Sequence, residues 1–425
     1  MPIFASLVML LAASAAAAPS TGLTRRQADS RAAELWANHC AEVAADTIAP
    51  LPRTVRLDSV RTALWHLPDS LEPAADMLYA FGTNGSAPAD GYPLYLYIHG
   101  SGPRDMEFAT GLQLTRNWAE ALPEGSAWFV PRIPNEGKYY RWWHQSKQWA
   151  WERLLRRIMA DNTFNPDRIY LLGISEGGYG SQRLASFYAD YFAAVGPMAG
   201  GEPLVNNPAD NLRNTPFSLL TGSNDIMFGR NLLTAYVGET LDSLAALWPG
   251  DYIHRVELQQ GRGHGIDYSP TAPWLSRFTR RTSPRRITWE DYAMDGRRRS
   301  AFANIEPLTR PESDDARVRY DLTIDSLTNS ITLNVDSVAY TTLEAEPMFG
   351  VPVRISRDFT PVTSGKVRIY LDDTMLDLDR PVNVTLNGRK LPAVSAPRTA
   401  DDLSRSLALW ADPRRLYPAS VTLAW

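Results

Sequence analysis

The chain has 425 residues, of which 44% are hydrophobic and 21% are charged, and its formal net charge is −4. This composition is that of a globular protein with a sizeable core, and the length suggests two domains. So small a net charge gives no reason to expect nucleic acid or an anionic membrane as the main partner. The single cysteine, Cys40, excludes an intramolecular disulfide and a cysteine-based zinc site, and we expect it to be an inert core residue.

Residues 1–18 have the pattern of a secretory signal peptide. An apolar run over residues 3–11 leads into an alanine-rich stretch that ends at Ala18, before Pro19, and small residues of this kind precede a cleavage site. No Lys or Arg precedes the apolar run, so the alternative is an uncleaved N-terminal helix of a cytosolic protein. No later segment has the roughly 20 apolar residues that a membrane span requires. We therefore expect an exported protein, secreted or periplasmic, without a membrane span.

Residues 51–275 alternate between segments typical of strands and of helices. This alternation predicts an α/β fold, with a mostly parallel sheet that has helices on both faces. The predicted strands cover residues 93–98, 127–130, 168–172, 192–195, 217–221 and 254–258, and the predicted helices cover residues 149–159, 182–188 and 231–247.

The character of the sequence changes after residue 276. Residues 277–286 are basic and contain a Ser-Pro pair that is typical of a linker. Apolar and polar residues then alternate strictly in segments 318–325, 331–335, 367–371 and 382–386, the last running into Asn387-Gly388, a hairpin turn signal. We predict three parts: a signal peptide (1–18), a catalytic domain (19–280) and a small all-β, sandwich-like domain (281–425).

The segment Gly173-Ile174-Ser175-Glu176-Gly177 fits the pattern G-x-S-x-G. A nucleophilic serine on a tight turn from a strand to a helix has glycines two residues away, because larger side chains would collide there. A predicted strand precedes this motif and a predicted helix follows it. The pattern is weakly specific by itself, and a glycine-rich turn without catalysis is the alternative. In this context it predicts Ser175 as a nucleophile.

A serine hydroxyl is a weak nucleophile until a base removes its proton. In enzymes with such an elbow, an acid and then a histidine follow the serine in the chain. His264 lies in the glycine-rich loop 261–265, just after a predicted strand, and His144 is its main rival. We expect structural or surface roles for the remaining histidines, which are His39, His66, His99 and His254.

His264 follows the predicted strand 254–258. The acid is expected after the previous strand, 217–221. Asp225 follows segment 217–221 and would hold the imidazole in the correct tautomer. Asp210 and Asp267 are the alternatives, and Asp225 could instead be a helix N-cap.

Acyl transfer also needs donors for the developing oxyanion. The backbone amide of Glu176 is one candidate, and the loop His99-Gly100-Ser101-Gly102 supplies the second. The sequence leaves open whether Ser101 or Gly102 donates, and His99 is expected to fix the loop.

The loop 99–102, the elbow at Ser175, Asp225 and His264 follow one another in the chain, and this arrangement resembles the α/β-hydrolase superfamily over residues 51–280. Within it, segments 141–144, 173–180 and 261–264 are similar to secreted bacterial hydrolases of the esterase, dienelactone-hydrolase and prolyl-oligopeptidase-like branches. The resemblance implies the triad Ser175, Asp225 and His264, and a hydrolytic domain followed by a small β-rich one. A full prolyl oligopeptidase also has a propeller domain, for which this chain has no room.

Two further features bear on specificity. Trp142, Trp143 and His144 are candidates for lining a substrate pocket, whereas Trp149 and Trp151 are expected to pack a helix onto the sheet. Two arginine clusters are expected on solvated faces, or paired with carboxylates such as Glu312, Asp314 and Asp315; binding of an anionic polymer is the alternative. These clusters are Arg277, Arg280, Arg281, Arg285 and Arg286, and Arg297, Arg298 and Arg299.

We hypothesise an exported carboxylic ester hydrolase that forms an acyl-serine and acts on a small-molecule or glycan-linked ester. No metal or nucleotide motif occurs, and this chemistry needs no cofactor. The alternatives are a prolyl-oligopeptidase-like peptidase and a non-catalytic glycan- or partner-binding protein.

Overall fold

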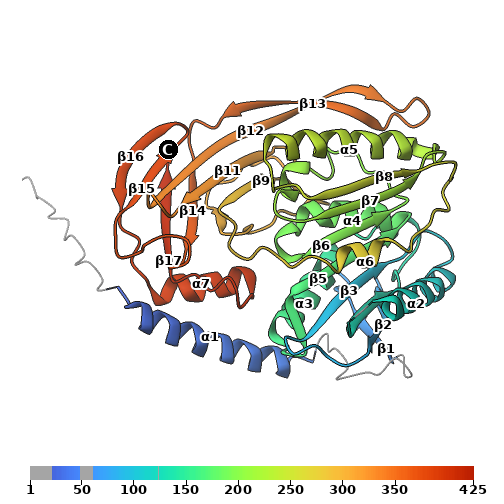
Figure 1. The fold of residues 1–425 in the computed structure, drawn as a ribbon, viewed down its shortest axis with the longest axis horizontal. Helices are drawn as coiled ribbons and strands as arrows, with labels where there is room; N and C mark the ends of the chain where they lie inside the picture. Colours follow the sequence, from blue (N-terminus) through green and yellow to red (C-terminus); the bar gives the residue numbers. More distant parts are fainter. Residues whose placement is uncertain (1–21, 48–60, 123) are drawn as a thin grey trace, which may run out of the picture.

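The computed structural model describes residues 22–47, 61–122 and 124–425, so the predicted signal peptide lies outside the described residues. The first sheet has eight strands in the order β1-β2-β4-β3-β5-β6-β7-β8 (Figure 1). Every pair from β4 to β8 is parallel, and β1 and β2 add an antiparallel edge. The strands are β1 (Arg61–His66), β2 (Asp76–Asn84), β3 (Tyr92–Ile98), β4 (Ser126–Pro131), β5 (Phe164–Ile174), β6 (Ala194–Met198), β7 (Phe217–Gly222) and β8 (His254–Gln259). The predicted mostly parallel sheet is confirmed, and β1 and β2 are additional to the predicted strands.

Helices cover both faces of this sheet. On one face, Leu94 and Leu96 of β3 belong to a core cluster that also contains Leu184. On the other face, Tyr95 and Tyr97 belong to a second cluster. Because every residue of β3 is buried, the strand is apolar throughout, as expected of a central parallel strand. The first face packs α3 (Gln145–Ala160), α4 (Glu176–Phe187) and α5 (Arg230–Leu247), and the second packs α2 (Arg104–Ala121) and α6 (Thr271–Leu275).

The C-terminal region is rich in β-structure, as predicted, but it is not all-β, because it also contains the helix α7 (Ala400–Trp410). One sheet has the order β16-β15-β12-β11-β9, with β13 paired to β12, and a second has the order β10-β14-β17. In β11, buried residues alternate with half-buried ones, which is the period-two pattern seen in the sequence. One pair, β12 with β15, is parallel rather than antiparallel. The strands are β9 (Arg286–Asp291), β10 (Ile305–Pro307), β11 (Val318–Asp325), β12 (Ser330–Ala345), β13 (Pro352–Pro361), β14 (Lys366–Leu371), β15 (Val382–Leu386), β16 (Arg389–Val394) and β17 (Ala419–Ala424).

The sequence patterns do not predict α1 (Arg25–Ala45), α2, α6 and α7, and two of these, α1 and α7, lie side by side along one edge of the molecule (Figure 1). Thr24 begins α1 with a capping box, and Thr399 caps α7; each cap satisfies backbone donors that the first turn leaves free. Cys40 lies half-buried in α1 rather than in the core, and burial raises the pKa of its thiol.

The predicted domain boundary at residue 280 falls between α6 and β9, where the chain passes from the first sheet to the second. One hydrophobic cluster nevertheless runs across this point, from Leu184 and Tyr188 to Trp289 and Tyr320. Two independently folding domains therefore stay a prediction. No helix within the described ranges is both long and apolar enough to cross a bilayer.

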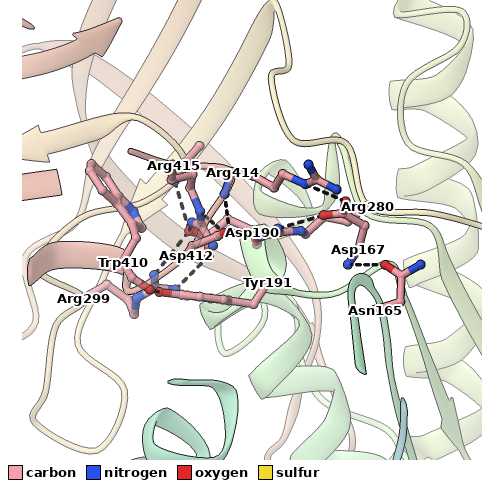
Figure 2. Close-up of polar contacts among 11 residues, drawn as sticks. Asn165, Asp167, Asp190, Tyr191, Arg280, Arg299, Trp410, Asp412, Arg414 and Arg415 are labelled. Carbon is pink, nitrogen blue, oxygen red and sulfur yellow. Dashed lines mark hydrogen bonds and ion pairs between the residues drawn. The ribbon is translucent and has the colours of Figure 1, made fainter. Parts of the chain in front are cut away.

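A buried network of arginines and aspartates also joins the two parts (Figure 2). Asp190, between α4 and β6, accepts hydrogen bonds from Arg299, at 2.9 Å, and from Arg415. Asp412 accepts from Arg280 and, at 2.6 Å, from Arg415. These five side chains are at most 8% exposed.

Of the two arrangements expected for the arginine clusters, solvation or pairing with carboxylates, Arg280 and Arg299 show the second, because both are buried and paired. Their carboxylate partners differ from the expected ones: they include Asp190, Asp412 and Asp167, and not Glu312, Asp314 or Asp315. Burial alone would raise the pKa of Asp412, but the guanidinium groups of Arg280 and Arg415 outweigh it and hold the pKa far below its usual range. Both aspartates therefore stay charged within the core.

Candidate active site

Ser175 occupies a sharp turn between β5 and α4. Its backbone has φ 57° and ψ −115°, a conformation that costs a non-glycine residue about 1–3 kcal/mol. A Cβ atom at Gly173 would lie 2.0 Å from the carbonyl oxygen of Gly177, and one at Gly177 would lie 2.0 Å from that of Ile98. Only glycine fits at either position. The structure thus has the strand-turn-helix context that the motif predicts.

The structure brings together the three residues predicted to form a triad. His264 Nε2 lies 2.9 Å from Ser175 Oγ, and His264 Nδ1 lies 2.7 Å from Asp225 Oδ2. The three residues follow β5, β7 and β8, whose carboxyl ends share one edge of the sheet because the strands are parallel. The loop that carries His264 passes close over Gly222, where a Cβ would lie 2.0 Å from the Gly263 carbonyl oxygen.

The sequence analysis missed a fourth residue, Arg230, which begins α5. Its Nη1 donates to Asp225 Oδ1 at 2.9 Å, and its Nε donates to the Tyr179 hydroxyl, also at 2.9 Å. Burial alone would raise the pKa of Asp225, but the hydrogen bond from His264 and the Arg230 guanidinium outweigh it and lower the pKa. Asp225 is therefore ionised and held from both sides. No sequence motif marks Arg230, because its role depends on how α5 packs.

The alternative acids have other partners. Asp210 accepts hydrogen bonds from Arg319 and Arg357 of the C-terminal sheet. Asp267 accepts from the backbone amide of Ser269, two residues further along its own loop.

The alternative base, His144, also lies elsewhere. Its Nδ1 contacts Ser146 Oγ at 3.2 Å, and its Nε2 is 3.7 Å from Asp295. His254 bonds to the Tyr252 carbonyl oxygen and to Asp242, which is a structural role.

The loop after β3 lies directly against the nucleophile. A Cβ atom at Gly100 would be 3.2 Å from Ser175 Cβ. His99 holds this loop: its Nδ1 donates to the Gly100 carbonyl oxygen at 2.8 Å, and its Nε2 accepts from the Ile133 amide at 3.1 Å. Burial lowers the pKa of His99 to about 4, so the imidazole is neutral at pH 7. These contacts are those of a residue that fixes the loop.

The Tyr140 hydroxyl contacts one of the two amides predicted to donate from this loop. It donates to the Gly100 carbonyl oxygen and accepts from the Gly102 amide at 3.4 Å. The Gly102 amide therefore points to Tyr140. The amides of Ser101 and of Glu176 stay candidate oxyanion donors; the amide of Glu176 opens α4 and has no intrahelical acceptor.

Trp142 does not line a substrate pocket, contrary to the prediction. It is completely buried, and its Nε1 donates to the His99 carbonyl oxygen at 2.8 Å. Its Cβ leaves no room for a Cβ at Gly180, which would lie 2.6 Å away. Trp142 thus supports the loop and the elbow from behind, and the physical reason is that its indole fills the space between them.

The neighbouring aromatic residues also pack against the protein. Trp143 is half-buried, with the guanidinium carbon of Arg183 4.1 Å from its ring centroid. The Trp151 Nε1 donates to the Trp142 carbonyl oxygen at 3.0 Å, and Arg153 lies over the Trp149 ring. The packing role predicted for Trp149 and Trp151 is in line with these contacts.

Glu176 follows the nucleophile, and its carboxylate is 13% exposed. Arg141 Nη1 donates to it at 3.3 Å. Burial raises the pKa of Glu176 to about 7, against the opposing effect of Arg141. The folded protein therefore holds a proton on this carboxyl at a pH where an unfolded chain has lost it.

We expect this group to make the protein less stable as the pH rises. A folded-state pKa of about 7, raised from 4.5, means that the folded state binds more protons between these values, so the free energy of unfolding falls across that window by up to about 3 kcal/mol. Urea unfolding at pH 5 and pH 8 measures this fall, and Glu176→Gln should remove it. An equal pH dependence in the wild type and Glu176→Gln would contradict the raised pKa.

The strand order, the glycine-flanked elbow and the positions of Ser175, Asp225 and His264 define an α/β-hydrolase fold. No known protein-family profile matches the chain. A protein named as an esterase, NocK of Nocardia uniformis subsp. tsuyamanensis, is 27% identical over 194 residues, which cover 42% of this chain and 52% of NocK. The match therefore spans about half the length of that relative.

Solved structures resemble about half of the chain. A thermostable esterase has a TM-score of 0.39 at 18% identity and covers 53% of this chain and 64% of its own. A protein described as a dipeptidyl aminopeptidase IV, from Bacteroides ovatus, has a TM-score of 0.39 at 14% identity, covering 52% and 34%. The depolymerase LpqC of Bordetella parapertussis, described as acting on poly(3-hydroxybutyrate), has a TM-score of 0.38 at 16% identity, covering 52% and 87%. At these values we rest the fold assignment on the strand order and not on the neighbours.

Proposed function

We propose that this protein is an exported carboxylic ester hydrolase that works through an acyl-serine intermediate. The observation that carries the proposal is the hydrogen-bonded chain from Ser175 Oγ through the imidazole of His264 to Asp225, at 2.9 and 2.7 Å. A hydroxyl, a base and an orienting carboxylate at these distances form the arrangement that activates a serine.

In the proposed reaction, His264 Nε2 takes the Ser175 proton as Oγ attacks the ester carbonyl carbon. Asp225 stabilises the imidazolium, and the backbone amides of Ser101 and Glu176 donate to the oxyanion. The tetrahedral intermediate collapses, the C–O bond to the alcohol breaks, and His264 gives its proton to the leaving oxygen. A water molecule, deprotonated by the same His264, then attacks the acyl-serine, and the acid leaves as Ser175 regains its proton.

Two observations favour an ester over a peptide substrate. The name of NocK is that of an esterase. Two carboxyl groups near the site are also engaged: Glu176 accepts from Arg141 at 3.3 Å, and Glu202 accepts from Arg183 at 2.7 Å and from Asn206 at 2.8 Å. Neither is free to bind the amino terminus of a peptide. We propose a small-molecule or glycan-linked ester as substrate, and export rests on the signal pattern in residues 1–18.

A fluorophosphonate probe tests the nucleophile directly. We expect the probe to label the wild type and Ser101→Ala, whose backbone amide is kept, but not Ser175→Ala. Turnover of p-nitrophenyl esters without turnover of aminoacyl-p-nitroanilides would support an esterase. Labelling of Ser175→Ala, or turnover of the anilides alone, would contradict the proposal.

A further inference from the structure

The hairpin of β12 and β13 extends from the C-terminal sheet along α5 (Figure 1). Two contacts anchor it to that helix. The Tyr236 hydroxyl donates to the Ile355 carbonyl oxygen at 2.7 Å, and Arg354 pairs with Glu239 at 2.7 Å. A Cβ atom at Gly229, just before α5, would lie 3.1 Å from Glu346 Cγ, so the hairpin reaches the loop that carries the proposed catalytic acid.

The tip of the hairpin packs on that loop. The ring centroid of Phe349 lies 4.5 Å from that of Phe228, in the turn η4 (Met227–Gly229). The carboxylate of Glu346 accepts hydrogen bonds from the amides of Met348, at 2.9 Å, and Phe349, at 2.7 Å. The tip is therefore held by its own carboxylate and by an aromatic contact, and it does not hang free in solvent.

Large apolar side chains gather where the two segments meet. Ile226 and Met227, from the acid loop, are 72% and 58% exposed, and Met348 and Phe349, from the hairpin tip, are 77% and 51% exposed. We call these four residues the rim patch. Single exposed apolar residues need no explanation, but exposed apolar residues that two distant segments bring together form a candidate binding surface.

Contacts connect the rim patch to the proposed site. Ile226 directly follows Asp225 in the chain. Phe228, which packs on Phe349, also lies against the guanidinium of Arg230, 5.1 Å from its ring centroid. Arg230 in turn holds Asp225. The patch thus adjoins the site at Asp225, on the side of Arg230.

We propose that the rim patch binds an alkyl chain of the ester substrate, so that the C-terminal β-region selects esters with long apolar groups. Two features favour an alkyl chain. The patch consists of aliphatic, thioether and phenyl groups without a polar side chain, and unbranched Met side chains adapt to a flexible apolar ligand. Each methylene of a bound chain that leaves water then adds to the affinity for the transition state. This inference rests on the proposed esterase activity.

The test compares p-nitrophenyl octanoate with p-nitrophenyl acetate. We expect the wild type to prefer octanoate by kcat/KM, and Met348→Ser combined with Phe349→Ser to lower the octanoate-to-acetate ratio about tenfold, because several methylenes lose their apolar partners. Ile226→Ser is a second variant at a largely exposed position and should lower the ratio in the same direction.

Leu327→Ser is the matched control. Leu327 is 94% exposed in the turn at the other end of β12, so its replacement should leave the ratio unchanged. A wild type that prefers acetate, or rim-patch variants with the wild-type ratio, would overturn the inference while the esterase proposal stands. A wild type that hydrolyses neither ester and takes no fluorophosphonate would overturn the proposed function itself.

Discussion

Replacing Ser175 by Ala is expected to lower kcat by about 10⁴- to 10⁶-fold, and His264→Ala should cost about as much. The two side chains act as one unit, because the imidazole at 2.9 Å from Oγ has no proton to take when the hydroxyl is absent. The double variant should therefore lose little beyond either single change. Steady-state kinetics on a p-nitrophenyl ester measures all three variants.

Asp267→Asn is the matched control for the acid. Asp267 lies in the same loop as His264, but its carboxylate bonds to the Ser269 amide. Its replacement should change kcat far less than Asp225→Asn. If Asp267→Asn were as damaging as Asp225→Asn, or if the Ser175 and His264 losses multiplied in the double variant, the assignment of these roles would be wrong.

Replacing Asp412 by Asn is expected to destabilise the protein by about 3–5 kcal/mol, because it leaves two buried guanidinium groups without their shared carboxylate. Asp412 is completely buried, and Arg280 and Arg415, which bond to it, are each 3% exposed. Asparagine keeps the shape of the side chain and removes the charge. The midpoint and slope of urea unfolding, followed by tryptophan fluorescence, give the change.

Asp379→Asn is the control for this substitution. Asp379 also pairs with an arginine, Arg398, at 2.7 Å, but its side chain is 77% exposed, so water can replace the interaction. Its unfolding midpoint should match that of the wild type. If the two variants shifted the midpoint alike, the network would be no more important to stability than a surface pair.

Local patterns predicted the parts of the structure that depend on neighbouring residues. The alternation in segment 318–325 predicted the strand β11, and the glycines around Ser175 predicted the turn between β5 and α4. Both signals arise from residues that are close in the chain. The meeting of Asp225 with His264 could be predicted as well, since the carboxyl ends of parallel strands share one edge of the sheet.

Features that depend on packing between distant segments could not be predicted in this way. Arg230 is one of many arginines in the sequence, and only the packing of α5 places it on Asp225. Trp142 has an aromatic side chain of the kind that lines substrate pockets, but it fills the space behind the loop of His99. The burial of Arg280 likewise depends on Asp412, 132 residues further along the chain. Export and the domain boundary stay predictions.

The arginine–aspartate network limits how this protein can be divided or recombined. A fragment that stopped at residue 280 would keep Asp190 but lose both arginines that bond to it, Arg299 and Arg415, and would keep Arg280 without Asp412. If a fusion replaced the C-terminal β-region by a foreign one, buried charged residues on both sides of the junction would thus lose their partners. The eight-stranded sheet and the C-terminal β-region should accordingly be produced, transplanted and evolved as one piece.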